Sequence, residues 1–202
     1  NKFIKAKELI EKLLKSEREN LTYKFYYGLI LANDRRYKDA IPFFERVLLS
    51  DRNHYDSNFN MAGCYQGLLI FDKAIETYKN CTKIDVNKFE PYHQIGVCYR
   101  QLREYEDSII FLNKALKISL NAKSLYVLGN VYRENGQLEE ARKSFEKSIS
   151  VNKEFTQSKL SIANLEIDNG NYDQASKLLD EIIQSNNSDQ ILISAKIMIG
   201  NI

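Results

Sequence analysis

The stretch "LYVLGNVYRENGQLEEARKSFEKSI" (residues 125–149) repeats the outline of "YHQIGVCYRQLREYEDSIIFLNKAL" (residues 92–116), which begins 33 residues earlier. Both stretches have a glycine, a tyrosine three places later, and then a Tyr or Leu followed at fixed distances by a small and a large apolar residue. The residues between these places differ. Because size is kept at fixed places while the rest varies, the pattern indicates a constraint on packing more than on chemistry.

The same places recur along most of the chain, with separations of 34, 34, 33 and 34 residues. A fixed period of this length is the mark of a repeat architecture. Each period has an aromatic residue or leucine, then a small residue, then a large apolar residue. These places are Tyr37, Phe71, Tyr105, Leu138 and Tyr172, then Ala40, Ala74, Ser108, Ala141 and Ala175, then Phe44, Tyr78, Leu112, Phe145 and Leu179.

Each period contains two stretches of about 12 residues with apolar residues at helical spacing, separated by a turn such as "ENGQ" (134–137). The sequence therefore predicts a helical hairpin in each period. Small residues such as Gly96 and Ala74 let the two helices approach closely. One upstream place is broken, because Glu166 stands where the other periods have leucine or tyrosine.

This pattern resembles the tetratricopeptide repeat over nearly the whole chain. The resemblance implies an all-α fold, a right-handed superhelical solenoid of antiparallel helix hairpins. We interpret residues 1–202 as a single array and as a segment of a longer protein, without the tryptophan typical of the first helix. The expected full repeats are 21–54, 55–88, 89–121, 122–155 and 156–189, flanked by a second helix at 3–20 and the first helix of a further repeat at 190–202.

Composition excludes several classes of protein. The chain has 29 Lys and Arg against 27 Asp and Glu, and the two signs alternate without a basic block, so we expect no nucleic-acid partner. There is no apolar leader and no apolar run of 18 residues, so we expect no membrane insertion. An odd number of cysteines, three, is typical of a reducing compartment, and we predict a cytoplasmic protein.

No residues form a recognisable catalytic, metal or cofactor site. Cys64, Cys81 and Cys98 occupy packing places, and no Cys-x-x-Cys or histidine cluster accompanies them. The two histidines, His54 and His93, belong to no set with a nucleophile. We therefore predict no catalytic residues, no metal, no cofactor and no enzymatic activity.

The resemblance implies that the first helices line a concave groove that holds a partner's peptide segment or helix. Among these places is a ladder in which four of five members are rings that the hairpin contacts do not require: Phe25, Phe59, His93, Tyr126 and Leu160. The alternative is that these rings pack against neighbouring helices. The expected groove residues are Phe25, Tyr26, Leu29, Phe59, Asn60, His93, Gln94, Val97, Arg100, Tyr126, Asn130, Arg133, Leu160 and Asn164.

Two of these residues, Arg100 and Arg133, lie in the last turn of their helices. A cation there stabilises the helix C-terminus, and the alternative is that it receives a partner's carboxylate. The resemblance also gives a negative result. The lysines, arginines and asparagines with which chaperone co-factors of this family hold a C-terminal carboxylate are absent here, apart from Asn60.

The leading hypothesis is a non-catalytic scaffold that binds a partner protein within a larger cytoplasmic assembly. One alternative is the recognition region of an enzyme whose catalytic domain lies outside these residues. Another is self-association through the apolar C-terminal helix, where "ILISAKIMIG" (191–200) contains a single charge.

Overall fold

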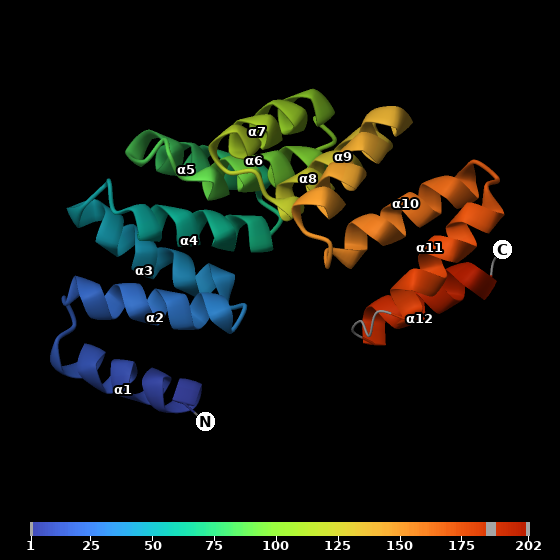
Figure 1. Ribbon diagram of the computed structural model, residues 1–202. Coiled ribbons are helices and arrows are strands. Elements are labelled where there is room, and N and C mark those ends of the chain that lie inside the picture. The colour runs from blue at the N-terminus through green and yellow to red at the C-terminus, as the bar shows by residue number, and fades with distance from the viewer. Residues whose placement is uncertain (1, 185–188, 201–202) are drawn as a thin grey trace. The chain divides into compact units, whose positions relative to one another are not determined.

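The computed structural model describes residues 2–184 and 189–200, and within these ranges the chain forms twelve α-helices and no β-strand (Figure 1). The predicted all-α array of paired helices is confirmed. The helices are α1 (Lys2–Ser16), α2 (Leu21–Asn33), α3 (Tyr37–Ser50), α4 (Tyr55–Gly67), α5 (Phe71–Ile84), α6 (Phe89–Gln101), α7 (Tyr105–Ile118), α8 (Ala122–Glu134), α9 (Leu138–Val151), α10 (Thr156–Asp168), α11 (Tyr172–Gln184) and α12 (Asp189–Gly200).

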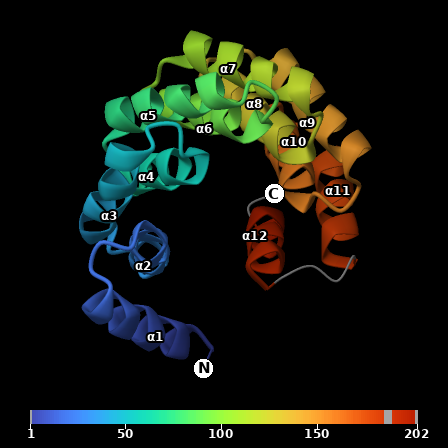
Figure 2. The same ribbon diagram turned by 90° about the vertical axis from the view of Figure 1, so that its left-hand side faces the viewer.

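The chain divides into two compact units, Asn1–Glu104 and Tyr105–Ile202. In unit 1, α2 packs on α3 and α4 packs on α5, and α1 covers one side of α2. Figure 2 shows α2 and α4 on the inner side of this unit, with α3 and α5 outside them. In unit 2, α8 packs on α9, and α10 packs on α11.

Five short turns that follow α2, α4, α6, α8 and α10 share one backbone motif. Each contains a residue with positive φ, and the next residue donates its N–H to the carbonyl five residues back, as from Gln137 to Tyr132 at 2.8 Å. This is the Schellman arrangement, in which a left-handed residue ends a helix. The left-handed residues are Arg35, Leu69, Arg103, Gly136 and Gly170.

In the hairpins α2–α3 and α8–α9, a glycine of the first helix meets the large residue of the second helix, and these large residues, Phe44 and Phe145, are completely buried. A Cβ added at Gly28 would lie 3.0 Å from the Phe44 ring, and one added at Gly129 would lie 2.5 Å from the Phe145 ring. The second distance is shorter than any ordinary carbon contact. Glycine at 129 is therefore required by the approach of α8 to α9.

Two helical glycines give opposite predictions. Gly129→Ala should lower the free energy of unfolding by about 1–3 kcal/mol, because the new methyl group overpacks against Phe145. Gly63→Ala should raise it by up to about 1 kcal/mol, because alanine favours helix and the new Cβ would lie 3.7 Å from the Tyr78 hydroxyl, an ordinary contact. Urea denaturation measures both, and equal effects would contradict the packing described.

Candidate partner-binding groove

A groove of about 910 Å³ lies in unit 1 between α1, α2 and α4, with contributions from α3, α5 and α6. Leu9 of α1 and Tyr26 of α2 line it and are 56% and 50% exposed. Phe59 and Asn60 of α4 line it from the next repeat. None of the residues that line the groove is Asp, Glu, Lys, Arg or His.

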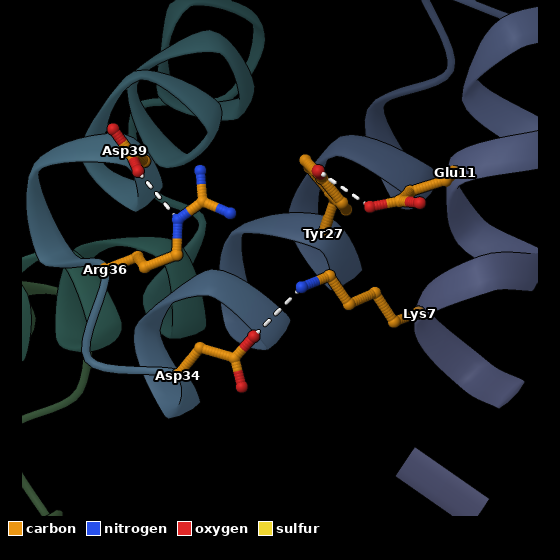
Figure 3. Close-up of polar contacts among 6 residues, drawn as sticks. All are labelled: Lys7, Glu11, Tyr27, Asp34, Arg36 and Asp39. Carbon is orange, nitrogen blue, oxygen red and sulfur yellow. Dashed lines mark hydrogen bonds and ion pairs between the residues drawn. The ribbon is translucent and has the colours of Figure 1, made fainter. Parts of the chain in front are cut away.

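Polar contacts tie α1 to α2 beside the groove (Figure 3). The Lys7 ammonium lies 3.2 Å from the Asp34 carboxylate, and the Tyr27 hydroxyl donates to the Glu11 carboxylate at 3.1 Å. Burial and then this carboxylate raise the pKa of Tyr27. Because Lys7 and Glu11 are one turn apart, they share a face of α1, and Ala6, Leu9 and Ile10 are left to line the groove.

The rings of the predicted ladder rest on the buried rings of the second helices. The Phe59 ring packs edge-on against Tyr78, with ring centroids 5.3 Å apart. The Phe25 ring contacts Phe44 at 6.0 Å, and in unit 2 the Tyr126 ring contacts Phe145 at 6.0 Å. These half-buried rings therefore contribute to hairpin packing as well as presenting some surface.

Three amide side chains in the groove, those of Asn60, Gln66 and Gln94, bond to one another, to the Tyr78 hydroxyl or to backbone. The Tyr78 hydroxyl donates to Gln66 Oε1 at 3.0 Å, and Gln66 Nε2 donates to Gln94 Oε1 at 3.4 Å. Asn60 Nδ2 donates to the carbonyl oxygen of Asp56, one turn back on its own helix, at 2.7 Å. Intramolecular hydrogen bonds thus hold the Gln66 amide, the Gln94 amide oxygen and Asn60 Nδ2.

The structure brings five of the predicted residues together in the groove and distributes the others. Phe25 lines a separate hollow with His54 and Asp56, and Val97 and Arg100 are half-buried on α6. His93 and Asn130 lie in the interior, 4% and 3% exposed, which leaves little surface for a partner. Tyr126, Arg133, Leu160 and Asn164 are half-buried in unit 2. The five in the groove are Tyr26, Leu29, Phe59, Asn60 and Gln94.

Sequence reasoning missed Ala6, Leu9 and Ile10 of α1. The resemblance assigns binding to first helices, and α1 was predicted to be a second helix. The signal was present, because Ala6 and Ile10 match the small and large places of the later repeats. The corresponding residues of α3, Ala40 and Phe44, are buried against the first helix α2, whereas Ala6 of α1 is exposed.

The three cysteines are buried and form no disulfide. Burial raises the pKa of Cys64 to about 11 and the pKa values of Cys81 and Cys98 to about 12. The thiols are therefore protonated at neutral pH and poor nucleophiles. Among the described residues no group of three His, Cys, Asp or Glu side chains is arranged to hold a metal ion.

The broken place of the repeat is a buried ion pair in unit 2. Glu166 on α10 is 2% exposed, pairs with the Arg142 guanidinium of α9, and accepts a hydrogen bond from Asn171 Nδ2 at 2.8 Å. Burial by itself would raise the pKa of Glu166, but Arg142 and Asn171 together lower it below the usual value. The carboxylate is thus ionised, and it fixes α10 against α9.

The ion pair predicts acid sensitivity. Since the pKa of Glu166 is lower in the folded state, its contribution is complete above the unfolded value of about 4.3 and is lost as the pH falls through the folded value. Glu166→Gln should lower the free energy of unfolding at pH 7 by about 1–3 kcal/mol and remove this acid-dependent part. Denaturation between pH 3 and 7 measures it, with Glu146→Gln on the exposed face of α9 as the control. Identical pH profiles for wild type and Glu166→Gln would contradict the assignment.

The helical hairpins and their groove define a class, the all-α repeat proteins. Three tetratricopeptide repeat models match residues 1–56, 87–154 and 132–196, and a model of the anaphase-promoting complex, cyclosome, subunit 3 matches residues 33–115. The chain belongs to the tetratricopeptide repeat family. Proteins of this family are interaction scaffolds, so proteins are the expected partners.

Relatives and solved structures agree with this assignment. The BBSome complex member BBS4 of Bos taurus is 26% identical over 102 residues, which cover 50% of this chain and 20% of the relative. The chain spans about a fifth to a third of the length of the BBS4 relatives that it matches.

Two solved structures share the fold. The crystal structure of MamA has a TM-score of 0.70 at 23% identity and covers 84% of this chain and 95% of its own. YrrB, described as a TPR protein with an unusual peptide-binding site, has a TM-score of 0.66 at 14% identity, with 93% and 97% covered. No helix in the described ranges combines the length and apolar character needed to cross a bilayer.

Proposed function

We propose that the chain is a non-catalytic scaffold whose unit 1 groove binds a segment of a partner protein within a larger cytoplasmic assembly. The observation that carries the proposal is the uncharged groove lined by α1, α2 and α4. Exposed apolar surface is costly in water, and contiguous patches of it commonly mark interaction sites.

The residues of the groove wall have the character of interface anchors. Tyr26 exposes half of its surface, and tyrosine is enriched among residues that contribute most to binding. Leu9 of α1, which also lines the groove, exposes a similar fraction of its surface. A partner side chain that contacts both Leu9 and Tyr26 would remove its own apolar surface and theirs from water.

The family models and relatives support the assembly part of the proposal. One matched model describes a subunit of the anaphase-promoting complex, and the relative BBS4 is a member of the BBSome complex. The three buried thiols, which form no disulfide, support a reducing compartment such as the cytoplasm.

Substitution of Tyr26 tests the groove. Tyr26→Lys places a charge at the half-exposed wall, so partner recovery in affinity purification from the cell of origin should fall at least about tenfold. The melting temperature should stay nearly unchanged, because Tyr26 is not part of the buried core.

Leu49→Lys is the matched control, because Leu49 is 75% exposed on α3 and does not line the groove. Recovery with this variant should equal that of wild type. Equal recovery with Tyr26→Lys and Leu49→Lys would contradict the proposal.

We also propose self-association through α12. Ile193 and Ile197 are exposed and lie one turn apart on the same face of this helix, which supports an apolar contact there. Sedimentation velocity should show a concentration-dependent dimer that Ile197→Lys abolishes. A strictly monomeric wild-type protein at high concentration would contradict this second proposal.

A further inference from the structure

A hollow of about 610 Å³ lies within unit 2, where α8 packs against both α7 and α9. Its residues on α8 are Leu125, Leu128 and Tyr132, which are three and four residues apart and so lie on one face of the helix. The predicted groove residues Tyr126 and Arg133 lie on a different face of α8. This unit 2 hollow is therefore separate from the partner groove that the repeat pattern predicts.

The unit 2 hollow lies at a place of the repeat that holds a small residue. Ser144 on α9 lines the hollow and directly precedes the buried residue Phe145. The same place in the other full repeats holds Phe43, Thr77, Phe111 and Leu178. A serine side chain occupies much less volume than the phenylalanine or leucine of three of these repeats, so space is left over it.

The first repeat shows how a larger residue uses this space. The Phe43 ring packs edge-on against the Tyr27 ring, with ring centroids 4.9 Å apart. In unit 2 the matching residues are Ser144 and Leu128, and both line the hollow. A side chain from outside the chain therefore finds room where the first repeat places a ring of its own.

The floor of the unit 2 hollow is apolar. Leu125 and Leu128 lie at its base and are 3% and 5% exposed, and Leu120 also lines it. The Ser144 hydroxyl donates to the carbonyl oxygen of Glu140 on its own helix at 2.8 Å, so it does not need a polar partner. A large apolar side chain is the group that this floor accommodates best.

Exposed lysines surround this apolar floor. Lys117 lies on α7, and Lys143 and Lys147 lie one turn apart on α9, whereas Glu140 is the one acidic side chain that lines the hollow. In residues 2–184 and 189–200 none of the three ammonium groups forms an ion pair with a carboxylate. Since the chain as a whole is nearly balanced in charge, the excess of positive charge is a property of this place. The complementary partner is anionic.

A protein segment supplies both kinds of group that the unit 2 hollow requires. Its apolar side chain covers leucine surface, and carboxylates on neighbouring residues reach the lysines at the rim. The phosphate backbone of a nucleic acid would pair with the lysines but leave the leucines uncovered, and it would bring phosphates close to Glu140. The observations thus favour an acidic peptide.

We propose that the unit 2 hollow binds an acidic segment of a partner protein. The segment places one large apolar side chain over Ser144 and Leu128, and its Asp or Glu residues pair with Lys117, Lys143 and Lys147. Burial of the apolar side chain supplies most of the affinity, while the exposed lysines mainly speed association. The hollow shares no residue with the unit 1 groove, so this site goes beyond the function proposed above and does not depend on it.

Selection from a random peptide library displayed on phage, with the full-length protein as bait, tests the proposal. The expected binders carry one large apolar residue flanked by Asp or Glu. Ser144→Leu should weaken a selected synthetic peptide at least about tenfold, because the new side chain fills the hollow. Its melting temperature should equal or exceed that of wild type, since leucine occupies the same place at Leu178. Ser150→Leu is the matched control, because Ser150 is exposed on α9 outside the hollow, and it should leave the affinity unchanged.

A charge reversal at the rim provides a second test that does not alter the packing. Lys147→Glu should weaken the same peptide and reduce the dependence of its affinity on sodium chloride, because screening acts on the exposed ion pairs. Lys153→Glu makes the same change at an exposed residue that does not line the hollow, and it should have little effect.

The other outcomes separate this site from the unit 1 groove. Peptides that bind Ser144→Leu and Lys147→Glu as well as wild type, or a consensus without acidic residues, would overturn the proposal. If every selected peptide is instead lost with Tyr26→Lys, the groove is the binding site and the unit 2 hollow is not. Binding of phosphatidylserine vesicles that Lys147→Glu abolishes, with no acidic peptide selected, would assign the lysines to a lipid surface and also overturn it.

Discussion

The close contact between a small residue on one helix of a hairpin and a large residue on the other sets the geometry of each repeat. Gly28 lies against Phe44, and Gly129 against Phe145, so closely that a methyl group fits poorly or not at all. Once this contact fixes how the two helices pack, the same positions of successive first helices are left outside the hairpin. Tyr26 and Asn60, which are one period apart, both line the groove for this reason.

The hairpins could be predicted from the sequence because this contact is periodic. Their turns could be predicted only in part. Gly136 and Gly170 signal a left-handed residue, whereas Arg35, Leu69 and Arg103 adopt the same conformation without any local preference for it. There the helices of unit 1 impose the turn on the sequence. Glu166 is a different case. It breaks the repeat pattern and forms a buried ion pair with Arg142, which lies 24 residues earlier in the sequence, so local spacing does not reveal the pair.

For the groove residues, the repeat pattern predicts some properties and not others. Periodicity gives the face of a helix on which a residue lies, and Tyr26, Asn60 and Gln94 were placed on that basis. It does not give depth, which depends on how far neighbouring helices extend, so His93 and Asn130 were placed on a surface although they are buried. The α1 wall was missed because binding was assigned to first helices, and α1 was predicted to be a second helix.

The central claim is that recognition depends on an uncharged wall formed by α1, α2 and α4, with α1 as much a part of it as the first helices. Amide hydrogen exchange of the full-length protein, with and without a bound partner segment, tests this most directly. The account predicts slower exchange in peptides from residues 5–16, 21–33 and 55–67, with unchanged exchange in residues 41–50 of α3 and in α9. Protection confined to α3 and α5, or confined to unit 2, would contradict it.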